Sequence, residues 1–195
     1  MIVRMTMISR NVIELRGVRF KDAFEWGGSL YYRILTSLPT HEYADIVEYD
    51  ELGHIPTSWG DVGTVDVLYP FTPADVYVVD GVVCGWITLT CQNTGGDGTA
   101  YIKPSVDIAK IMDDGSEEVE GGFECHQHIF DFDAGGGSIT VAFPYWINLS
   151  AMKVEQDERI VLRITAEGVA THNAFDLYVA MRRNSKDVMA RLPIV

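Results

Sequence analysis

Short runs of turn-forming residues divide the chain at regular intervals from residue 64 onward, and this spacing restricts the fold more than any other feature. The runs are rich in Gly, Asn, Asp and Glu and lie at 93–98, 113–116, 135–137, 155–158 and 167–168. Gly, Asn and Asp favour the backbone conformations of tight turns. The segments between them have the composition of strands: 64–69, 75–80, 82–91, 99–111, 123–130, 138–143, 147–154, 159–166 and 174–183. Evenly spaced strands with almost no helical periodicity predict an all-β chain folded as an antiparallel β-sandwich.

Alternation of apolar and polar residues identifies the clearest single strand. In the segment 159–166, Ile160, Leu162 and Ile164 alternate with residues that are mostly polar. Side chains two apart on a strand point to the same face, so this segment should cover one side of a core. The sandwich can be of the jelly-roll or immunoglobulin-like kind, since both are built from strands of this spacing. At most one short C-terminal helix is expected, at 185–191, ended by Pro193.

The first third of the chain is less regular. Strands are predicted at 2–8, 11–18 and 30–35, whereas residues 36–63 contain two prolines and three glycines and predict a long surface loop with one short helix near 43–47. A loop of this length is expected to pack on something. The predicted division is therefore an N-terminal part, 1–63, packed on a neighbour or on the body, and a β-sandwich domain, 64–195.

Charge is distributed unevenly along the chain. The net charge is −13, from 15 basic and 28 acidic residues, and residues 34–102 contain ten acids without a single Lys or Arg. The basic residues gather toward the two ends. A nucleic-acid-binding protein needs a basic surface that neutralises phosphates, so no nucleic-acid partner is expected. Apolar runs are too short for a membrane helix or a signal peptide, so neither is expected.

The segment 82–95 carries a resemblance to a known class of protein. It reads VVCGWITLTCQNTG, an apolar strand that ends in an Asn-x-Gly turn, and Gly98 and a second long strand follow. This order resembles the strand–turn–strand hairpin of immunoglobulin-like adhesion modules and of the β-sandwich proteins that decorate the capsids and tails of tailed viruses. The resemblance covers residues 82–111. It implies a two-sheet sandwich used in assembly or adhesion, without catalysis.

One cluster of side chains has the chemistry of a metal site. On a strand, Glu124, His126 and His128 would point to one face, with Cys125 and Gln127 on the other. Two imidazoles and a carboxylate are suitable ligands for zinc, iron or copper. This pattern supports the hypothesis of a cupin-like metal-dependent enzyme, although the Gly-rich context and the later Glu and His of cupins are absent. Solvent-exposed histidines are the competing interpretation, and no cofactor is expected.

Two acidic loops are candidates for calcium binding. Asp131 and Asp133 resemble the opening of a calcium loop, but position 142, where a bidentate acid would close it, is Ala142. Asp113 and Asp114 form the second acidic loop. Both pairs also fit the alternative of solvated hairpin tips.

Three cysteines, an odd number, argue against a disulfide framework. Cys84 and Cys91 lie seven apart, so on one strand they face opposite sides and cannot bond to each other. Each cysteine is expected to act as a small apolar residue. Trp59 lies in a predicted loop and is a better candidate for an exposed contact. With Tyr43 or Tyr69 as a second aromatic it would suit a sugar.

The leading hypothesis from the sequence is a virion structural protein, capsid-associated or tail-associated, that acts through assembly contacts and is not an enzyme. It predicts a homo-oligomer that contacts other virion proteins and is made in the host cytoplasm without a signal peptide. The alternatives are a carbohydrate-binding, adhesive module that takes a glycan, and the cupin-like enzyme. The residues expected to make assembly contacts are Arg4, Arg10, Arg16, Arg19, Trp26, Trp59, Arg182 and Arg183.

Overall fold

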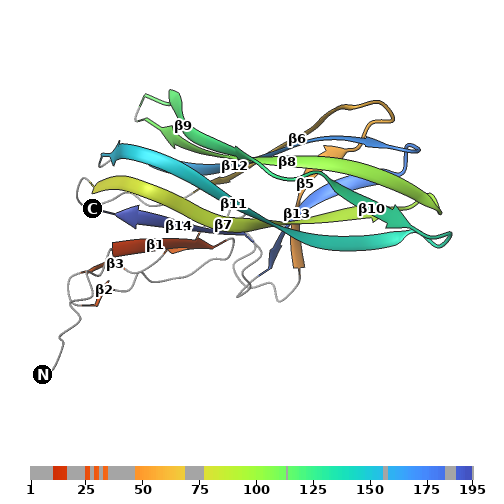
Figure 1. Cartoon of the computed structure of the whole chain (residues 1–195), viewed down its shortest axis with the longest axis horizontal. Coiled ribbons are helices and arrows are strands. Elements are labelled where there is room, and N and C mark those ends of the chain that lie inside the picture. The colour runs from red at the N-terminus through yellow and green to blue at the C-terminus, as the bar shows by residue number, and fades with distance from the viewer. Residues whose placement is uncertain are drawn as a thin grey trace, which may run out of the picture.

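The computed structural model describes residues 11–16, 25–26, 29–30, 33–34, 47–68, 77–112, 114–155, 158–182 and 188–194. Within these ranges the backbone forms strands and turns and no helix. They therefore include no helix that could cross a membrane. Figure 1 shows the strands in two main layers, which form an antiparallel β-sandwich as the turn spacing predicts. A separate two-stranded ribbon joins β2 (Glu25–Trp26) to β3 (Ser29–Leu30).

The first sheet is organised around one long strand, β7 (Tyr77–Asn93). One edge of β7 pairs along almost its whole length with β11 (Gly137–Val154). The other edge is shared, because β14 (Met189–Ile194) pairs with the first part of β7 and β13 (Phe175–Arg182) with its last part. The sheet is completed by three strands: β1 (Asn11–Arg16) next to β14, β4 (Arg33–Ile34) next to β1, and β5 (Val47–His54) next to β13.

The second sheet repeats this plan around β8 (Gly98–Ile111). One edge of β8 pairs with β12 (Arg159–Ala170), which in turn pairs with β6 (Gly60–Leu68). The other edge is divided between β10 (His128–Phe132) and β9 (Glu117–Glu124). The central strand β7 is thus held by partners from distant parts of the sequence, whereas β8 pairs with the distant β12 and with β9 and β10, which follow it closely.

The core lies between the two sheets and is built from alternating positions. On β11, Phe143, Tyr145, Ile147 and Leu149 are buried, while the residues between them are exposed. On β12, Ile160, Leu162 and Ile164 are buried, which confirms the alternation predicted from the sequence. Burying apolar area of this kind is the main favourable contribution to folding.

The chain passes from one sheet to the other at the turn that follows β7. Asn93 is almost fully buried, and its side chain accepts a hydrogen bond from the Gly95 N–H and donates one to the Gly96 carbonyl. This arrangement supports the tight turn that the Asn-x-Gly sequence predicts. The turn does not close a hairpin, however. The strands on its two sides, β7 and β8, belong to different sheets, so the hairpin expected over 82–111 is wrong while the two-sheet sandwich is confirmed.

Strands β5 and β6 approach each other so closely that their backbones touch. Each strand carries a bulge here, with Leu52 as the extra residue in β5 and Val62 in β6. Both of these side chains are buried. Gly53 and Gly63 follow the bulges with positive φ angles of 147° and 157°. A Cβ at Gly63 would overlap the carbonyl of Leu52, and one at Gly53 would overlap the carbonyl of Val62.

Two further expectations about local structure need correction. The predicted loop 36–63 is wrong over 47–54 and 60–63, which belong to β5 and β6, because its glycines mark bulges and a tight connection instead of irregular chain. The predicted helix 185–191 is wrong over its last three residues, which begin strand β14 and pair with β1 and β7. Residues 183–187 lie outside the described part. The division of the chain at residue 63 stays a prediction.

Candidate functional site

A polar depression lies on the outer face of the second sheet. It encloses about 350 Å³ and is formed by outward-facing residues of β6, β12 and β8, with the end of β9. Four of the lining side chains are charged: Asp61, Lys103, Glu124 and Glu167. The other lining residues are glycine, alanine, serine and threonine, so they leave open space between the charged side chains. Their hydroxyl groups can donate and accept hydrogen bonds.

The strand register explains how these residues meet. Glu167 of β12 pairs with Asp61 of β6 on one side and with Lys103 of β8 on the other. Two residues along β8, Ser105 pairs with Glu124 of β9. The charged positions therefore form a row across four strands, and they face outward because the residues that alternate with them belong to the core.

One ion pair crosses the depression. The Lys103 Nζ lies 2.5 Å from a carboxylate oxygen of Glu124, and this hydrogen bond raises the pKa of Lys103 above its usual value. Both side chains are solvent-exposed, so the ion pair contributes little to stability and can rearrange. With three carboxylates and one ammonium, the lining keeps a net negative charge.

Trp59 neighbours the depression, because it bonds to Glu167, one of the lining residues. Its Nε1–H donates a 3.2 Å hydrogen bond to Glu167, and 46 % of the residue is exposed. The start of the connection that carries it is anchored to both sheets, because the Ile55 N–H donates to the Phe175 carbonyl of β13 and the Pro56 carbonyl accepts from the Ala170 N–H of β12. The indole is thus held in place while it stays accessible to a ligand.

A short apolar row borders the depression on the same face. Tyr101 of β8 pairs with Ile129 of β10 on one side and with Val169 of β12 on the other. Tyr101 is 36 % and Ile129 is 52 % exposed. Tyr101 is therefore a second accessible aromatic residue on the sheet that carries the depression. From the sequence, Tyr43 or Tyr69 was the expected second aromatic residue beside Trp59. Those two tyrosines lie outside the described residues.

The outer face of the first sheet has a different character. Val82 and Cys84 of β7 and Pro144 and Trp146 of β11 are exposed neighbours there, and we call them the β7–β11 patch. Val82 is 52 % exposed and Trp146 is 54 % exposed. The Trp146 ring also packs against Phe123 of β9, with 4.4 Å between ring centroids. Contiguous exposed apolar residues of this kind are typical of interaction surfaces.

The predicted metal ligands do not share one strand. Residues 125–127 interrupt the strand between β9 and β10, so the expected alternation of Glu124, His126 and His128 on one face is wrong. Glu124 bonds to Lys103, His126 is exposed, and the His128 ring packs edge-on against Phe130 and Phe143. Among the described residues, no three His, Cys, Asp or Glu side chains gather in a metal-binding arrangement.

The predicted calcium ligands are found at two separate places. Asp131 accepts a hydrogen bond from the Thr99 hydroxyl, and Asp133 lies in the turn between β10 and β11, where its backbone carbonyl accepts from the Gly136 N–H. Asp114 accepts from the backbone and hydroxyl of Ser116, which lowers the pKa of its carboxyl. Asp113 lies outside the described residues. Asp114 thus has the local contacts of a turn-stabilising residue.

Four of the eight predicted assembly residues lie within the described ranges. Trp59 is exposed, as expected. Arg16, Trp26 and Arg182 are placed by their strands, β1, β2 and β13. The remaining four, Arg4, Arg10, Arg19 and Arg183, lie outside the described residues.

The three cysteines are unpaired, and two are buried. Cys84 and Cys91 lie on β7 with one exposed and one buried, as their spacing predicts. Burial raises the pKa of the Cys91 thiol to about 12 and that of Cys125 to about 11. Both buried thiols therefore stay protonated at neutral pH and are poor nucleophiles.

Comparison with known proteins assigns no family. No family model and no curated protein matches the chain. Among solved structures, an aminopeptidase from a Thaumarchaeota archaeon aligns with 94 % of this chain and 37 % of its own, with TM-score 0.48 and 9 % identity. An α-amino acid ester hydrolase aligns with 68 % of this chain and 25 % of its own, with TM-score 0.40 and 11 % identity. A structure of the infectious bursal disease virus Gx strain aligns with 95 % of this chain and 56 % of its own, with TM-score 0.28 and 12 % identity.

The chain thus spans between a quarter and just over half of these solved chains. At such TM-scores and identities the similarities identify neither a family nor a function. What the protein does has to be inferred from its own surfaces.

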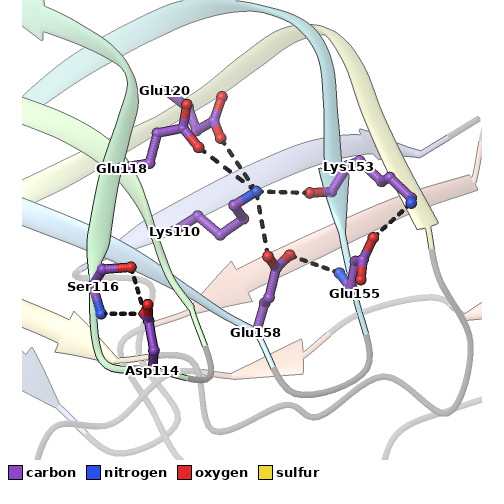
Figure 2. Close-up of polar contacts among 8 residues, drawn as sticks. All are labelled: Lys110, Asp114, Ser116, Glu118, Glu120, Lys153, Glu155 and Glu158. Carbon is purple, nitrogen blue, oxygen red and sulfur yellow. Dashed lines mark hydrogen bonds and ion pairs between the residues drawn. The ribbon is translucent and has the colours of Figure 1, made fainter.

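An ion-pair cluster surrounds Lys110 of β8 at one end of the sandwich (Figure 2). The side chain is only 12 % exposed, and its Nζ lies 3.5 Å from Glu158, 3.8 Å from Glu120 and 3.9 Å from Glu118. It also donates a hydrogen bond to the Lys153 carbonyl on β11. One lysine therefore neutralises carboxylates of the second sheet and bonds to the backbone of the first.

One signal in the sequence points to this cluster. Residues 103–152 contain nine acids and only two basic residues, Lys103 and Lys110. A lone cation within such an acidic segment is expected to have several carboxylate neighbours once the strands pair. Which carboxylates these are depends on the register between β8, β9 and β12, which local sequence does not reveal.

Replacing Glu120 by glutamine should stabilise the protein at neutral pH. Burial and the nearby Glu118 carboxylate raise the pKa of Glu120, while Lys110 opposes the rise. A carboxyl whose pKa is higher in the folded than in the unfolded chain loses stability as pH rises through the folded value. The expected gain is about 0.2–1 kcal/mol at pH 7, measured by urea unfolding.

Two comparisons test this expectation. The gain in stability should vanish below about pH 4, where Glu120 of the unmutated protein is protonated in both the folded and the unfolded chain. Glu118→Gln, at a more exposed carboxylate, should change stability less. A loss of stability at pH 7 in Glu120→Gln would show that the Lys110 contact outweighs burial and repulsion.

Proposed function

We propose that this protein is a non-catalytic structural component of a particle, and specifically of a virion, that assembles through protein–protein contacts. The observation that carries the proposal is the β7–β11 patch. Apolar side chains on the outward face of a sheet lose contact with water only when another surface covers them. Trp146 is a suitable anchor, because partly exposed tryptophans contribute strongly to interface energies.

The occupant we propose for the patch is a second copy of this chain. A rigid sandwich with one apolar face is suited to repeat in an assembly, where the same surface is used by every copy. The net charge of −13 opposes self-association at low ionic strength. Because salt screens this repulsion and leaves apolar burial intact, assembly should strengthen from low to high salt.

Light scattering after gel filtration of the full-length chain tests the proposal. We expect a species larger than 21.7 kDa whose population rises with salt. Trp146→Asp should dissociate it, whereas Ile129→Asp should not, because Ile129 is exposed to a similar extent on the other sheet. A monomer at every salt concentration, or equal effects of the two variants, would contradict self-assembly through this patch. The virion location is tested separately, by detecting the protein in purified particles.

A further inference from the structure

We infer that the depression beside Trp59 is a binding site for a neutral saccharide. The site lies on the second sheet and shares no residue with the β7–β11 patch on the first, so the two can be tested separately. Its volume of about 350 Å³ falls at the small end of the range for ligand sites, roughly 300–1,000 Å³. The inference rests on the shape of the site, on its hydrogen-bonding groups and on the exposed Trp59 bonded to one of them.

The charges of the lining select against other classes of ligand. Asp61, Glu124 and Glu167 outnumber the one cation, Lys103, so phosphates, nucleic acids and acidic sugars are repelled. The carboxylates are not gathered tightly enough to hold a metal ion, since no metal-binding group of three is found in the described residues. A ligand with many hydroxyl groups and no negative charge fits the remaining chemistry.

The hydrogen-bonding groups match the hydroxyls of a sugar. Carboxylate oxygens of Asp61 and Glu167 can accept hydrogen bonds from adjacent hydroxyls. The Lys103 ammonium has three donors, of which Glu124 uses one in the described structure. Donors and acceptors are therefore both present in the lining, as a ring with several hydroxyls requires.

Trp59 supplies the apolar part of the site. One face of a sugar ring consists largely of C–H groups, and these pack favourably on an aromatic ring. The hydrogen bond from Trp59 to Glu167 fixes the indole beside a carboxylate that lines the depression. A platform that is already ordered loses little conformational entropy when the ligand binds.

Saturation-transfer NMR with the full-length protein and a panel of neutral glucose, galactose and mannose disaccharides tests the inference. We expect at least one disaccharide to bind at millimolar concentration and Trp59→Ala to weaken its binding about tenfold or more. Glu167→Gln should weaken it as well. Trp146→Ala is the matched control, since it removes a tryptophan of similar exposure from the other sheet and should leave binding unchanged.

Three results would overturn the inference: no disaccharide binds, only acidic sugars bind, or Trp59→Ala binds as tightly as the native chain. Trp59→Phe guards against loss of folding, because it keeps an aromatic surface and should retain part of the affinity. The result is separable from the test of assembly. Trp59 variants should keep the salt-dependent association, and Trp146 variants should keep saccharide binding.

Discussion

Alanine at position 63 should lower the free energy of unfolding by about 3 kcal/mol. Two effects add at this residue. Gly63 has a φ of 157°, which side-chain-bearing residues rarely adopt, and its Cβ would overlap the Leu52 carbonyl on β5. Backbone strain and overpacking each cost about 1–3 kcal/mol. Urea unfolding followed by tryptophan fluorescence measures the loss.

Two other glycines separate these effects. Gly135→Ala introduces no contact, since no heavy atom lies within 4 Å of the new Cβ, and stability should stay within about 0.5 kcal/mol. Gly115 has a φ of 80° and open space around it, so Gly115→Ala should cost about 1 kcal/mol from conformation alone. If Gly63→Ala costs no more than Gly115→Ala, β5 and β6 do not touch as described.

Replacing Lys110 by methionine should lower the free energy of unfolding by about 2–3 kcal/mol at pH 7. The substitution keeps the apolar stem and removes the ammonium, which leaves Glu120 and Glu158 facing each other with little access to water. Removing one partner of a fully buried ion pair costs about 3–5 kcal/mol, and these carboxylates remain partly exposed. The lost hydrogen bond to the Lys153 carbonyl also loosens the link between the sheets.

Repulsion between the carboxylates is the expected cause of this loss, and two experiments test it. Adding Glu120→Gln and Glu158→Gln to Lys110→Met should recover most of the stability, because neutral amides do not repel each other. Lowering the pH below about 4 should also narrow the difference between native protein and Lys110→Met, because Glu120, whose pKa burial raises, becomes protonated. Lys153→Met is the control, since its ion pair with Glu155 is exposed and should matter little. A loss below about 0.5 kcal/mol in Lys110→Met would contradict the role of the cluster.

The strands with clear alternation were predictable because their pattern is local. Ile160, Leu162 and Ile164 face the core for the same reason that they alternate in the sequence. The sheet to which a strand belongs is a long-range property. The turn after Asn93 has the chemistry of a hairpin turn, yet pairing with β11 and β12 places its two strands in different sheets.

Glycine was the main source of error in the N-terminal half. Gly53, Gly60 and Gly63 predict irregular chain when they are interpreted locally, whereas two of them allow β5 and β6 to approach each other. The predicted metal site is wrong for a similar reason. The prediction needs an unbroken strand through Glu124, His126 and His128, whereas the strand is interrupted at 125–127. The depression was not predictable, since its charged residues come from four strands that only the register brings together.

The divided edge of β7 has a consequence for how the chain is made. During synthesis β7 leaves the ribosome long before β13 and β14, the two strands that share its second edge. Until those C-terminal strands arrive, an extended apolar segment keeps unpaired backbone groups that can pair with another nascent chain. The first sheet cannot be completed one hairpin at a time, so folding is expected to be slow and to finish only after residue 194 has been added.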